Sequence, residues 1–453
     1  MSGPPLVDAA HVHMVGVGGA GMSGLAKILA QAGHRVSGSD LKPSPAFAGL
    51  RAAGVETWVG HRPDRASEWD LVVASSAVPA ADPELAGAEQ AGVEVWQRPR
   101  LLEQMTAGMP ALGITGTHGK TSSTAMAVTA LRGIGRDPSF MVGGEMVGLH
   151  TNAHLGERDL FVLESDEAFG TFRGLRHRAL LVTNVEADHL DHYGTAGAVA
   201  EAFAAVAAAV EGPVVVCADD PGAVAAGGPD AITYGRAEGA AWRIADLRQE
   251  RAAVSFTLAH DGAAVGVTVP KPGLHVASNA AGVVVLLAAL GVDPAAAAAA
   301  LAGFAGVRRR FEVRAVRAGV TVVDDYAHHQ TELAATIAAA SGEGRVIAAF
   351  QPHRFTRTEE HSEALGAALA GADLVMVTDV YAAGEPPIPG VTGRLVADAA
   401  RRAGADAEFV PRRTDLAARL AAAARPGDVV LLLGAGDITL TADELAPLLG
   451  GSS

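Results

Sequence analysis

Residues 113–124 read GITGTHGKTSST, and their first residues complete the apolar run ALGIT (111–115). ALGIT is typical of a buried strand, and Lys120 and Thr121 begin a segment that is typical of a helix. A glycine loop between a strand and a helix can cradle phosphate oxygens with its backbone N–H groups. The lysine supplies a point charge between β- and γ-phosphates, and the Thr121 hydroxyl can bind Mg²⁺. The segment therefore predicts a site for a nucleoside triphosphate.

The loop departs from the usual G-x-x-x-x-G-K-[ST] pattern, because Ile114 occupies the position of its first glycine. The alternative is a glycine loop that carries a surface lysine. The strand before the loop and the hydroxylated helix after it favour the phosphate loop.

A second glycine turn, Gly16-x-Gly18-x-x-Gly21, lies near the N-terminus, at the end of the apolar run HVHMVGV (11–17). A helical segment comes next, and Asp40 ends the following strand, HRVSGSD (34–40). This order is typical of a βαβ unit that holds a diphosphate at a helix N-terminus and a ribose on the acid. It fits a dinucleotide as well as any other nucleotide diphosphate.

The alternation of apolar strands with helices continues along the chain and predicts three consecutive α/β domains. We expect a Rossmann-like domain at 1–107, a P-loop-type central domain at 108–306, and a second Rossmann-like domain at 307–453. The first boundary follows a helical segment, Leu101 to Gly108, and the break at Met109-Pro110. The apolar runs are LVVASS (71–76), VEVWQ (93–97), DLFVLES (159–165), ALLVTNV (179–185), GPVVVCA (212–218), TVVDDYA (321–327), RVIAAFQ (345–351), DLVMVTDV (373–380) and DVVLLLGAG (428–436).

Two other features of the central region are predicted from its pattern. Residues 240–259 resemble a hairpin, and two helices follow within 276–290 and 294–304. The second helix has favourable residues at its N-terminus, since Asp293 can cap it and Pro294 suits its first position.

Composition narrows the classes of protein. The chain has 453 residues, 49% apolar and 19% charged, which is typical of a globular protein. Its formal net charge of −15 argues against a nucleic-acid partner, and its single cysteine, Cys217, excludes an intrachain disulfide. The N-terminus lacks the basic start of a signal peptide, and the apolar stretch 280–292 is too short to span a bilayer. We therefore expect a cytoplasmic protein without a membrane partner.

Titratable groups gather where predicted strands end. Glu164 and Asp166-Glu167 close one strand, and Asp188 and His189 follow another. Carboxylates beside a phosphate loop indicate a Mg²⁺ site. Mg²⁺ prefers oxygen, so His189 could equally form hydrogen bonds or handle a proton.

In the third region, residues 324–329 and 350–358 each follow a strand and carry several histidines. Arg310, Arg354 and Arg357 add positive charge to an acidic protein. Guanidinium groups bind phosphates or carboxylates, and the alternative is a solvated charged edge.

Twelve strings spread over nearly the whole chain resemble the Mur ligase family, in the order in which the family has them. In particular, Thr115 to Thr121 match its ATP loop, T-G-T-x-G-K-[ST], so the missing glycine is the family's own variant. The strings are GVGGAGMSGLA, SGSD, SSAVP, GITGTHGKTSST, ESDE, TNVEADHLDHYG, HVASNA, GVRRRFE, DDYAHHQTE, FQPHRFTRT, DVYAAGEPPIPG and LLLGAGDI.

The resemblance implies a function for each domain. The first would bind a UDP-sugar, the second ATP with Mg²⁺ or Mn²⁺, and the third would close over both and bring an amino acid. The implied UDP-sugar ligands are Gly16, Gly18, Gly19, Gly21, Asp40, His61, Ser75, Ser76 and Asn184. The implied ATP ligands are Gly116, Thr117, His118, Gly119, Lys120, Thr121, Ser122, Asn279, Arg310 and Asp325.

The resemblance also implies the remaining roles. Thr121, Glu164 and His189 would bind the metal ion, and Tyr326, His328 and Arg357 would position the amino acid. Lys120, Glu164, His189, Arg310, His328 and His353 would be the catalytic residues. His353, His328 and His189 are alternative acceptors of the amine proton.

The implied reaction activates the lactyl carboxylate of UDP-N-acetylmuramate as an acyl phosphate and joins it to L-alanine, a cytoplasmic step of peptidoglycan synthesis. A monomer or weak homo-oligomer is expected. The chain departs from the family's E-A-D-E-S-D, since Ala168 and Phe169 end that motif here, and Gln330 replaces a usual proline.

Three other functions remain open. A ligase that attaches a recycled murein tripeptide to the same UDP-sugar shares many of these strings. An NAD-dependent dehydrogenase would explain the first glycine turn and leave Lys120 without a role. A non-catalytic ATP-driven switch would hydrolyse ATP without a carboxylate substrate.

Overall fold

The computed structural model describes residues 7–342 and 344–450, and their side chains except those of Phe169 and Asp191. The departure at Phe169 therefore lies outside the described side chains. The chain forms two compact units. The N-terminal unit contains most of the chain up to residue 305, and the C-terminal unit contains 306 onward together with 248–255 and 269–277.

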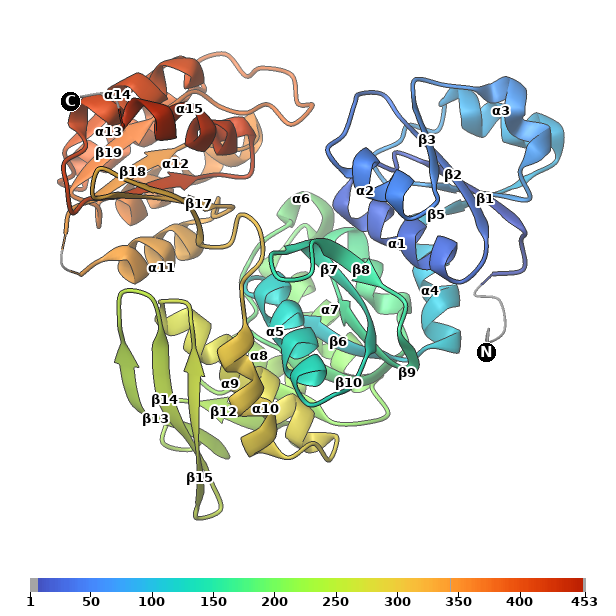
Figure 1. The fold of residues 1–453 in the computed structure, drawn as a ribbon, viewed down its shortest axis with the longest axis horizontal. Helices are drawn as coiled ribbons and strands as arrows, with labels where there is room; N and C mark the ends of the chain where they lie inside the picture. The colour runs from blue at the N-terminus through green and yellow to red at the C-terminus, as the bar shows by residue number, and fades with distance from the viewer. Residues whose placement is uncertain (1–6, 343, 451–453) are drawn as a thin grey trace. The chain divides into compact units, whose positions relative to one another are not determined.

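The first sheet has five parallel strands in the order β3-β2-β1-β4-β5 (blue in Figure 1). Every residue of β1 and β4 is buried, as expected for strands covered on both faces. Because the order reverses between β2 and β4, a ligand crevice is expected at the carboxyl end of β1. The elements are β1 (His11–Val15), α1 (Ala20–Gln31), β2 (Arg35–Asp40), α2 (Ala46–Ala52), β3 (Glu56–Val59), η1 (Pro63–Glu68), β4 (Leu71–Ala74), α3 (Pro83–Ala91), β5 (Glu94–Gln97) and α4 (Arg98–Gly108).

The second sheet has ten strands in the order β15-β14-β13-β12-β11-β10-β6-β9-β7-β8. Its central strand β6 is fully buried and pairs in parallel with β10 and β9. The strands are β6 (Ala111–Thr115), β7 (Pro138–Met146), β8 (Thr151–His154), β9 (Glu157–Glu164), β10 (His177–Val182), β11 (Val214–Cys217), β12 (Ile232–Gly235), β13 (Trp242–Gln249), β14 (Val254–His260) and β15 (Ala263–Val269). The helices along this part of the chain are α5 (Lys120–Gly133), η2 (Ala168–Gly174), α6 (Leu190–Tyr193), α7 (Ala196–Ala208), α8 (Pro221–Gly227), α9 (Leu274–Ala289), α10 (Pro294–Ala300) and η3 (Leu301–Gly303).

The third sheet has six strands in the order β16-β17-β21-β18-β19-β20, and only its edge strand β16 runs antiparallel to its neighbour. Its strands are β16 (Glu312–Arg317), β17 (Val320–Asp325), β18 (Val346–Phe350), β19 (Leu374–Val377), β20 (Ala407–Phe409) and β21 (Val429–Leu433). Its helices are α11 (Gln330–Ala340), α12 (Phe355–Leu369), α13 (Gly393–Arg402), η4 (Arg413–Asp415), α14 (Leu416–Ala423), η5 (Asp437–Thr439) and α15 (Leu440–Leu448).

The prediction of three α/β domains is confirmed, while the domain boundaries stay predictions. Asp293 caps α10 as expected, because its Oδ1 accepts a hydrogen bond of 3.1 Å from Ala295 N. The β7–β8 hairpin was not predicted from the sequence. Helix α4 begins at Arg98, earlier than expected, since Pro99 suits a first helical turn. Among the described residues, no helix is long and apolar enough to cross a membrane.

Candidate active site

The first glycine turn follows β1 and opens α1. Gly16 has φ +80°, a left-handed conformation that favours glycine, and a Cβ there would lie 3.1 Å from Ser75 Cβ. Asp40 Oδ2 accepts a hydrogen bond of 3.0 Å from Gly18 N. Two predicted UDP-sugar ligands, Asp40 and Ser75, therefore lie against the turn.

Other predicted UDP-sugar ligands lie on neighbouring loops. His61 follows Gly60, whose N–H donates to Asp40 O at 2.9 Å. The Nδ1 atom of His61 lies 3.6 Å from Asp82 Oδ2. Ser76 is exposed just after β4. Loops from β2, β3 and β4 thus surround the turn, as the topological switch requires.

The second glycine loop joins β6 to α5. Gly116 and Gly119 have φ of +131° and +83°, conformations that side chains rarely adopt. A Cβ at Gly119 would lie 2.6 Å from Asn279 Oδ1, so this predicted nucleotide ligand packs on the loop. Gly116 is equally restricted, because a Cβ there would collide with Thr183 Oγ1.

Residues that follow β10 form hydrogen bonds with this glycine loop. Asn184 Oδ1 accepts from His118 N at 2.8 Å, and its Nδ2 donates to His118 O at 3.1 Å. Thr117 Oγ1 accepts from Glu186 N at 2.8 Å. Asn184, which the resemblance implied as a UDP-sugar ligand, thus contacts the backbone of the predicted ATP loop.

Lys120 is held by an acid that was not among the predicted site residues. Its Nζ lies 2.8 and 2.9 Å from the two carboxylate oxygens of Glu167 and donates to Gly116 O at 2.6 Å. Burial lowers the pKa of Lys120, but the charges of Glu167 and Asp166 outweigh it and raise that pKa above its usual value. Lys120 is therefore a cation in the phosphate loop.

The position of Glu167 could have been noticed from the sequence. It belongs to the acidic run at the end of β9, in which only Glu164 received a role. What the sequence could not show is that the carboxylate of Glu167, the residue just before η2, lies against the Lys120 ammonium.

The predicted metal ligands include two oxygens already in contact. Thr121 Oγ1 donates to Glu164 Oε1 at 3.0 Å, and Glu164 Oε2 accepts from Gly143 N at 2.7 Å. A hydroxyl and a carboxylate beside a phosphate loop are the donors that Mg²⁺ prefers. The third predicted metal ligand is His189. Its Nε2 lies 3.9 Å from Oε1 of Glu167, the acid that pairs with Lys120. The oxygens of Thr121 and Glu164 fit Mg²⁺, and His189 as a third ligand stays a prediction.

In the C-terminal unit, Asp325 ends β17. Its carboxylate accepts from Phe311 N at 2.7 Å and from Ala327 N at 2.8 Å. Burial raises the pKa of Asp325 to about 6, although the charge of Arg310 opposes this shift. Asp325, which the resemblance implies as an ATP ligand, is therefore fixed by two backbone N–H groups and lies near Arg310, another implied ATP ligand.

The predicted amino-acid ligands form a ring cluster. The Tyr326 ring lies under the guanidinium of Arg310, 5.1 Å from its centroid, and meets His328 edge-on at 5.3 Å. His328 lies 6.0 Å from the ring of His353, which stacks on Tyr381 at 5.7 Å.

Burial keeps both histidines of this cluster neutral. It lowers the pKa of His353 to about 4, with further contributions from His328 and Arg357, and it also lowers the pKa of His328. Within the described part of the chain, His353 Nδ1 is buried without a hydrogen-bond partner. A neutral imidazole with a free nitrogen can accept a proton.

Gln330, which departs from the family pattern, is the first residue of α11. Proline is common at this helical position. His329 caps this helix together with Glu332 in a capping box.

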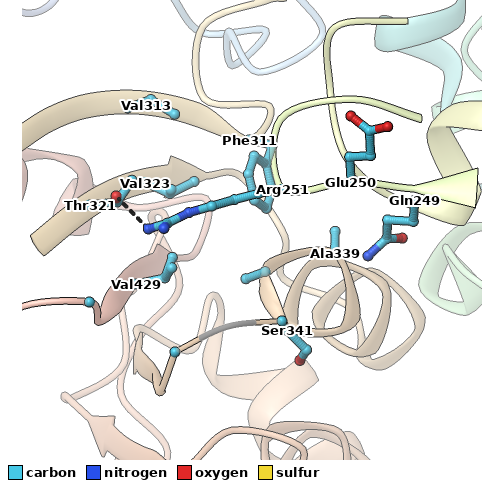
Figure 2. Close-up of a pocket in the computed structure, with 14 residues that line it drawn as sticks. Gln249, Glu250, Arg251, Phe311, Val313, Thr321, Val323, Ala339, Ser341 and Val429 are labelled. Carbon is cyan, nitrogen blue, oxygen red and sulfur yellow. Dashed lines mark hydrogen bonds between the residues drawn. The ribbon is translucent and has the colours of Figure 1, made fainter. Parts of the chain in front are cut away.

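A pocket of about 410 Å³ in the C-terminal unit has none of the predicted site residues in its lining. Figure 2 shows Arg251 reaching across it, where Nη2 donates to Thr321 Oγ1 at 3.4 Å. The apolar residues that line the pocket include Phe311, Val323 and Val429.

Comparison with known proteins supports one family over the whole chain. Residues 11–109 match a model described as Mur ligase family, catalytic domain; residues 114–287 match the Mur ligase middle domain; and residues 309–436 match the Mur ligase, glutamate ligase domain. The chain belongs to the Mur ligase family. It is therefore an enzyme, an ATP-dependent ligase, and not a dehydrogenase or a passive switch.

Individual Mur ligases resemble this one over nearly their full length. The UDP-N-acetylmuramate–L-alanine ligase of Cutibacterium acnes is 42% identical over 98% of this chain and 96% of its own. That of Acidothermus cellulolyticus is 44% identical over 96% and 94%. The crystal structure of UDP-N-acetylmuramate-alanine ligase MurC from Thermotoga maritima has a TM-score of 0.84 and 28% identity, and the match covers 96% of this chain and 98% of that one.

Proposed function

We propose that this Mur ligase joins the lactyl carboxylate of UDP-N-acetylmuramate to the amine of L-alanine and converts ATP to ADP and phosphate. The proposal is carried by one observation: relatives that are 42% and 44% identical over nearly the whole chain are named for this reaction. It would be a step of peptidoglycan precursor synthesis, in the cytoplasm, where both nucleotide substrates occur.

The proposed UDP-sugar site is the first glycine turn. The contacts of Asp40 and Ser75 with this turn support that assignment. The amides at the start of α1 would face the diphosphate, and Asp40 a ribose hydroxyl. His61, Ser76 and the remaining glycines keep the roles that the family resemblance implies.

The proposed ATP site is the second loop. Its amides would hold the phosphates, Lys120 would neutralise the β- and γ-phosphates, and Asn279 would contact adenine. Mg²⁺ held by Thr121, Glu164 and His189 would offset charge on the triphosphate. The contact between Thr121 and Glu164, 3.0 Å long, supports this placement of the metal ligands.

The proposed chemistry has two steps. A carboxylate oxygen attacks the γ-phosphorus, the bond to the β-γ bridging oxygen breaks, and ADP leaves with that electron pair. The alanine nitrogen then attacks the acyl carbon, and inorganic phosphate leaves. Because carboxylate and triphosphate repel each other, the protein's main contribution is charge neutralisation and alignment, to which Lys120 and Arg310 would contribute.

The amino-acid site is proposed in the ring cluster of the C-terminal unit. Arg357 would bind the alanine carboxylate, while Tyr326 and His328 border the amine. His353 is uncharged at pH 7, because burial lowers its pKa to about 4, and it is one candidate acceptor of the proton that the nitrogen loses, although so low a pKa makes it a weak base. His328 and His189 are the other candidate acceptors.

Product identification tests the proposal. Purified enzyme with ATP, Mg²⁺ and UDP-N-acetylmuramate is offered L-alanine, glycine, L-serine or murein tripeptide, and phosphate release and product mass are recorded. We expect one phosphate per L-alanine adduct. Activity with tripeptide and none with L-alanine would overturn the proposal in favour of the recycling reaction.

A further inference from the structure

Arg98 lies against the first glycine turn although it is far from that turn in the sequence. A Cβ at Gly21 would lie 2.6 Å from Arg98 Nη1. Gly21 is the second residue of α1, so the guanidinium reaches the N-terminal turn of this helix. Arg98 itself is the first residue of α4. The N-terminal turns of two helices therefore meet at this guanidinium.

This position is electrostatically unfavourable without an anion. Each helix carries about half a positive charge at its N-terminus, and a cation there is repelled. Neither α1 nor α4 has an acidic residue in its first turn or a side-chain cap. The nearest acid of the turn, Asp40, already accepts from Gly18 N.

Arg98 has no partner among the described residues that would relieve this repulsion. Among residues 7–342 and 344–450, no hydrogen bond or ion pair of its guanidinium is found, and Nε is buried without an acceptor. Its neighbour Arg100 behaves differently. Arg100 is 2.7 Å from Glu94 and lies over the Trp96 ring, 4.5 Å from the centroid.

Backbone amides, a buried unsatisfied Nε and a guanidinium thus converge on the place where the proposed substrate has its diphosphate. We propose that Arg98 binds the diphosphate of the UDP-sugar, as the cation that completes the first glycine turn. A guanidinium suits this role because it offers several donors to phosphate oxygens at once. The inference rests on the proposed function of the turn and adds a residue to it.

Glycine at position 21 leaves room for the guanidinium in this place. Gly21 does not have a positive φ, so its backbone would accept alanine. A Cβ there would meet only the flexible end of Arg98, so an alanine would displace the guanidinium from this position.

Steady-state kinetics test the inference with Arg98→Gln and with Arg100→Gln as the matched control. We expect Arg98→Gln to raise the KM for UDP-N-acetylmuramate and the Kd for UDP by about 10- to 100-fold, as for loss of a charged hydrogen-bond donor. The kcat and the KM for ATP should change less than about threefold, because the ATP loop is untouched. Arg98→Lys should recover part of the affinity, and Arg100→Gln should behave like the wild type.

Chemical modification of the wild-type enzyme gives a second test that needs no variant. Phenylglyoxal, which reacts with accessible arginines, is applied with and without UDP, and the modified residues are identified by mass spectrometry. We expect UDP to protect Arg98 at least fivefold, while Arg100 stays equally reactive and ATP protects neither.

A wrong function and a wrong role of Arg98 would give different results. If the wild type neither binds UDP nor ligates UDP-N-acetylmuramate, the proposed function is wrong. If it does both, and Arg98→Gln keeps the wild-type KM, or UDP leaves the modification of Arg98 unchanged, only the role of Arg98 is overturned.

Discussion

The two glycine loops of the N-terminal unit share one backbone plan and differ in the source of their positive charge. In the second loop the cation is Lys120, the first residue of the helix that the loop opens. In the first turn it is Arg98, which another helix brings to Gly21. Lys120 is already paired with Glu167, whereas Arg98 lacks a protein anion within the described residues.

This difference has a physical consequence for binding. A ligand at Lys120 has to replace a carboxylate that forms two hydrogen bonds with the ammonium. A ligand at Arg98 has no carboxylate of the described residues to replace, and it relieves the repulsion between a guanidinium and two helix termini. The two sites should therefore respond to substitution independently and in different ways.

The largest effect is expected from Lys120→Met. Loss of the charge between the phosphates should lower kcat/KM for ATP by about 10²- to 10³-fold, a magnitude typical of removing one transition-state contact. The Kd for UDP, measured by calorimetry, should change less than twofold. Lys42→Met, which removes an exposed lysine, is the control for ATP kinetics. A parallel loss of UDP binding in Lys120→Met would show that the loops are not independent.

Removal of the metal ion should distinguish the functions of the two loops almost as strongly as Lys120→Met does. Chelation with EDTA should abolish ligation and leave UDP binding intact. Glu164→Gln should raise the Mg²⁺ concentration needed for half-maximal activity by about 10- to 100-fold, as for weakened metal ligands. A Mg²⁺ titration of phosphate release measures this. An unchanged Mg²⁺ requirement would remove Glu164 from the metal site.

Asp40→Ala should affect only the first turn. It removes the carboxylate bound to Gly18 N and the proposed ribose ligand. We expect the KM for UDP-N-acetylmuramate to rise about tenfold, with the KM for ATP unchanged. A larger effect on ATP than on the UDP-sugar would contradict the assignment of the two sites.

Glu167→Gln should have a smaller effect, and it should strengthen nucleotide binding, whereas the preceding variants weaken substrate binding or activity. Without its charge, the side chain competes less for Lys120, so ADP should bind about three- to tenfold more tightly when Mg²⁺ is absent. Fluorescence titration with a labelled ADP measures this. Weaker ADP binding would mean that Glu167 holds Lys120 in place for the nucleotide and does not compete with it.

The last prediction concerns protein stability and its dependence on pH at His177, the first residue of β10. Burial lowers its pKa to about 4, below the unfolded value near 6.5. The unfolded chain therefore binds more protons between these values, and stability should fall by about 1–3 kcal/mol as pH drops from 6.5 to 4. His177→Gln should reduce this pH dependence in urea unfolding, and His150→Asn, at an exposed histidine, should not.

The sequence predicted what depends on local pattern. The strands around residues 11–17 and 111–115 and the cap at Asp293 follow from periodicity and capping chemistry, and the structure confirms them. The β7–β8 hairpin was missed, because its residues lack a clear alternation.

In the candidate site, too, the sequence predicted residues of a local motif and missed residues that tertiary packing brings together. Lys120 and Thr121 are neighbours in the chain, so a motif reveals them. Glu167 lies just before η2 and Arg98 begins α4, and no spacing in the sequence shows that they face the two loops. Tertiary packing of cations and acids is what the sequence could not predict.

A crystal structure with UDP-N-acetylmuramate, Mg²⁺ and a non-hydrolysable ATP analogue tests the division between the two loops most directly. We predict the triphosphate on the amides of 116–121 with Lys120 released from Glu167, and the diphosphate of the UDP-sugar at Gly18–Gly21 within hydrogen-bond distance of Arg98. A triphosphate at the first turn, or a UDP-sugar bound away from it, would contradict the account.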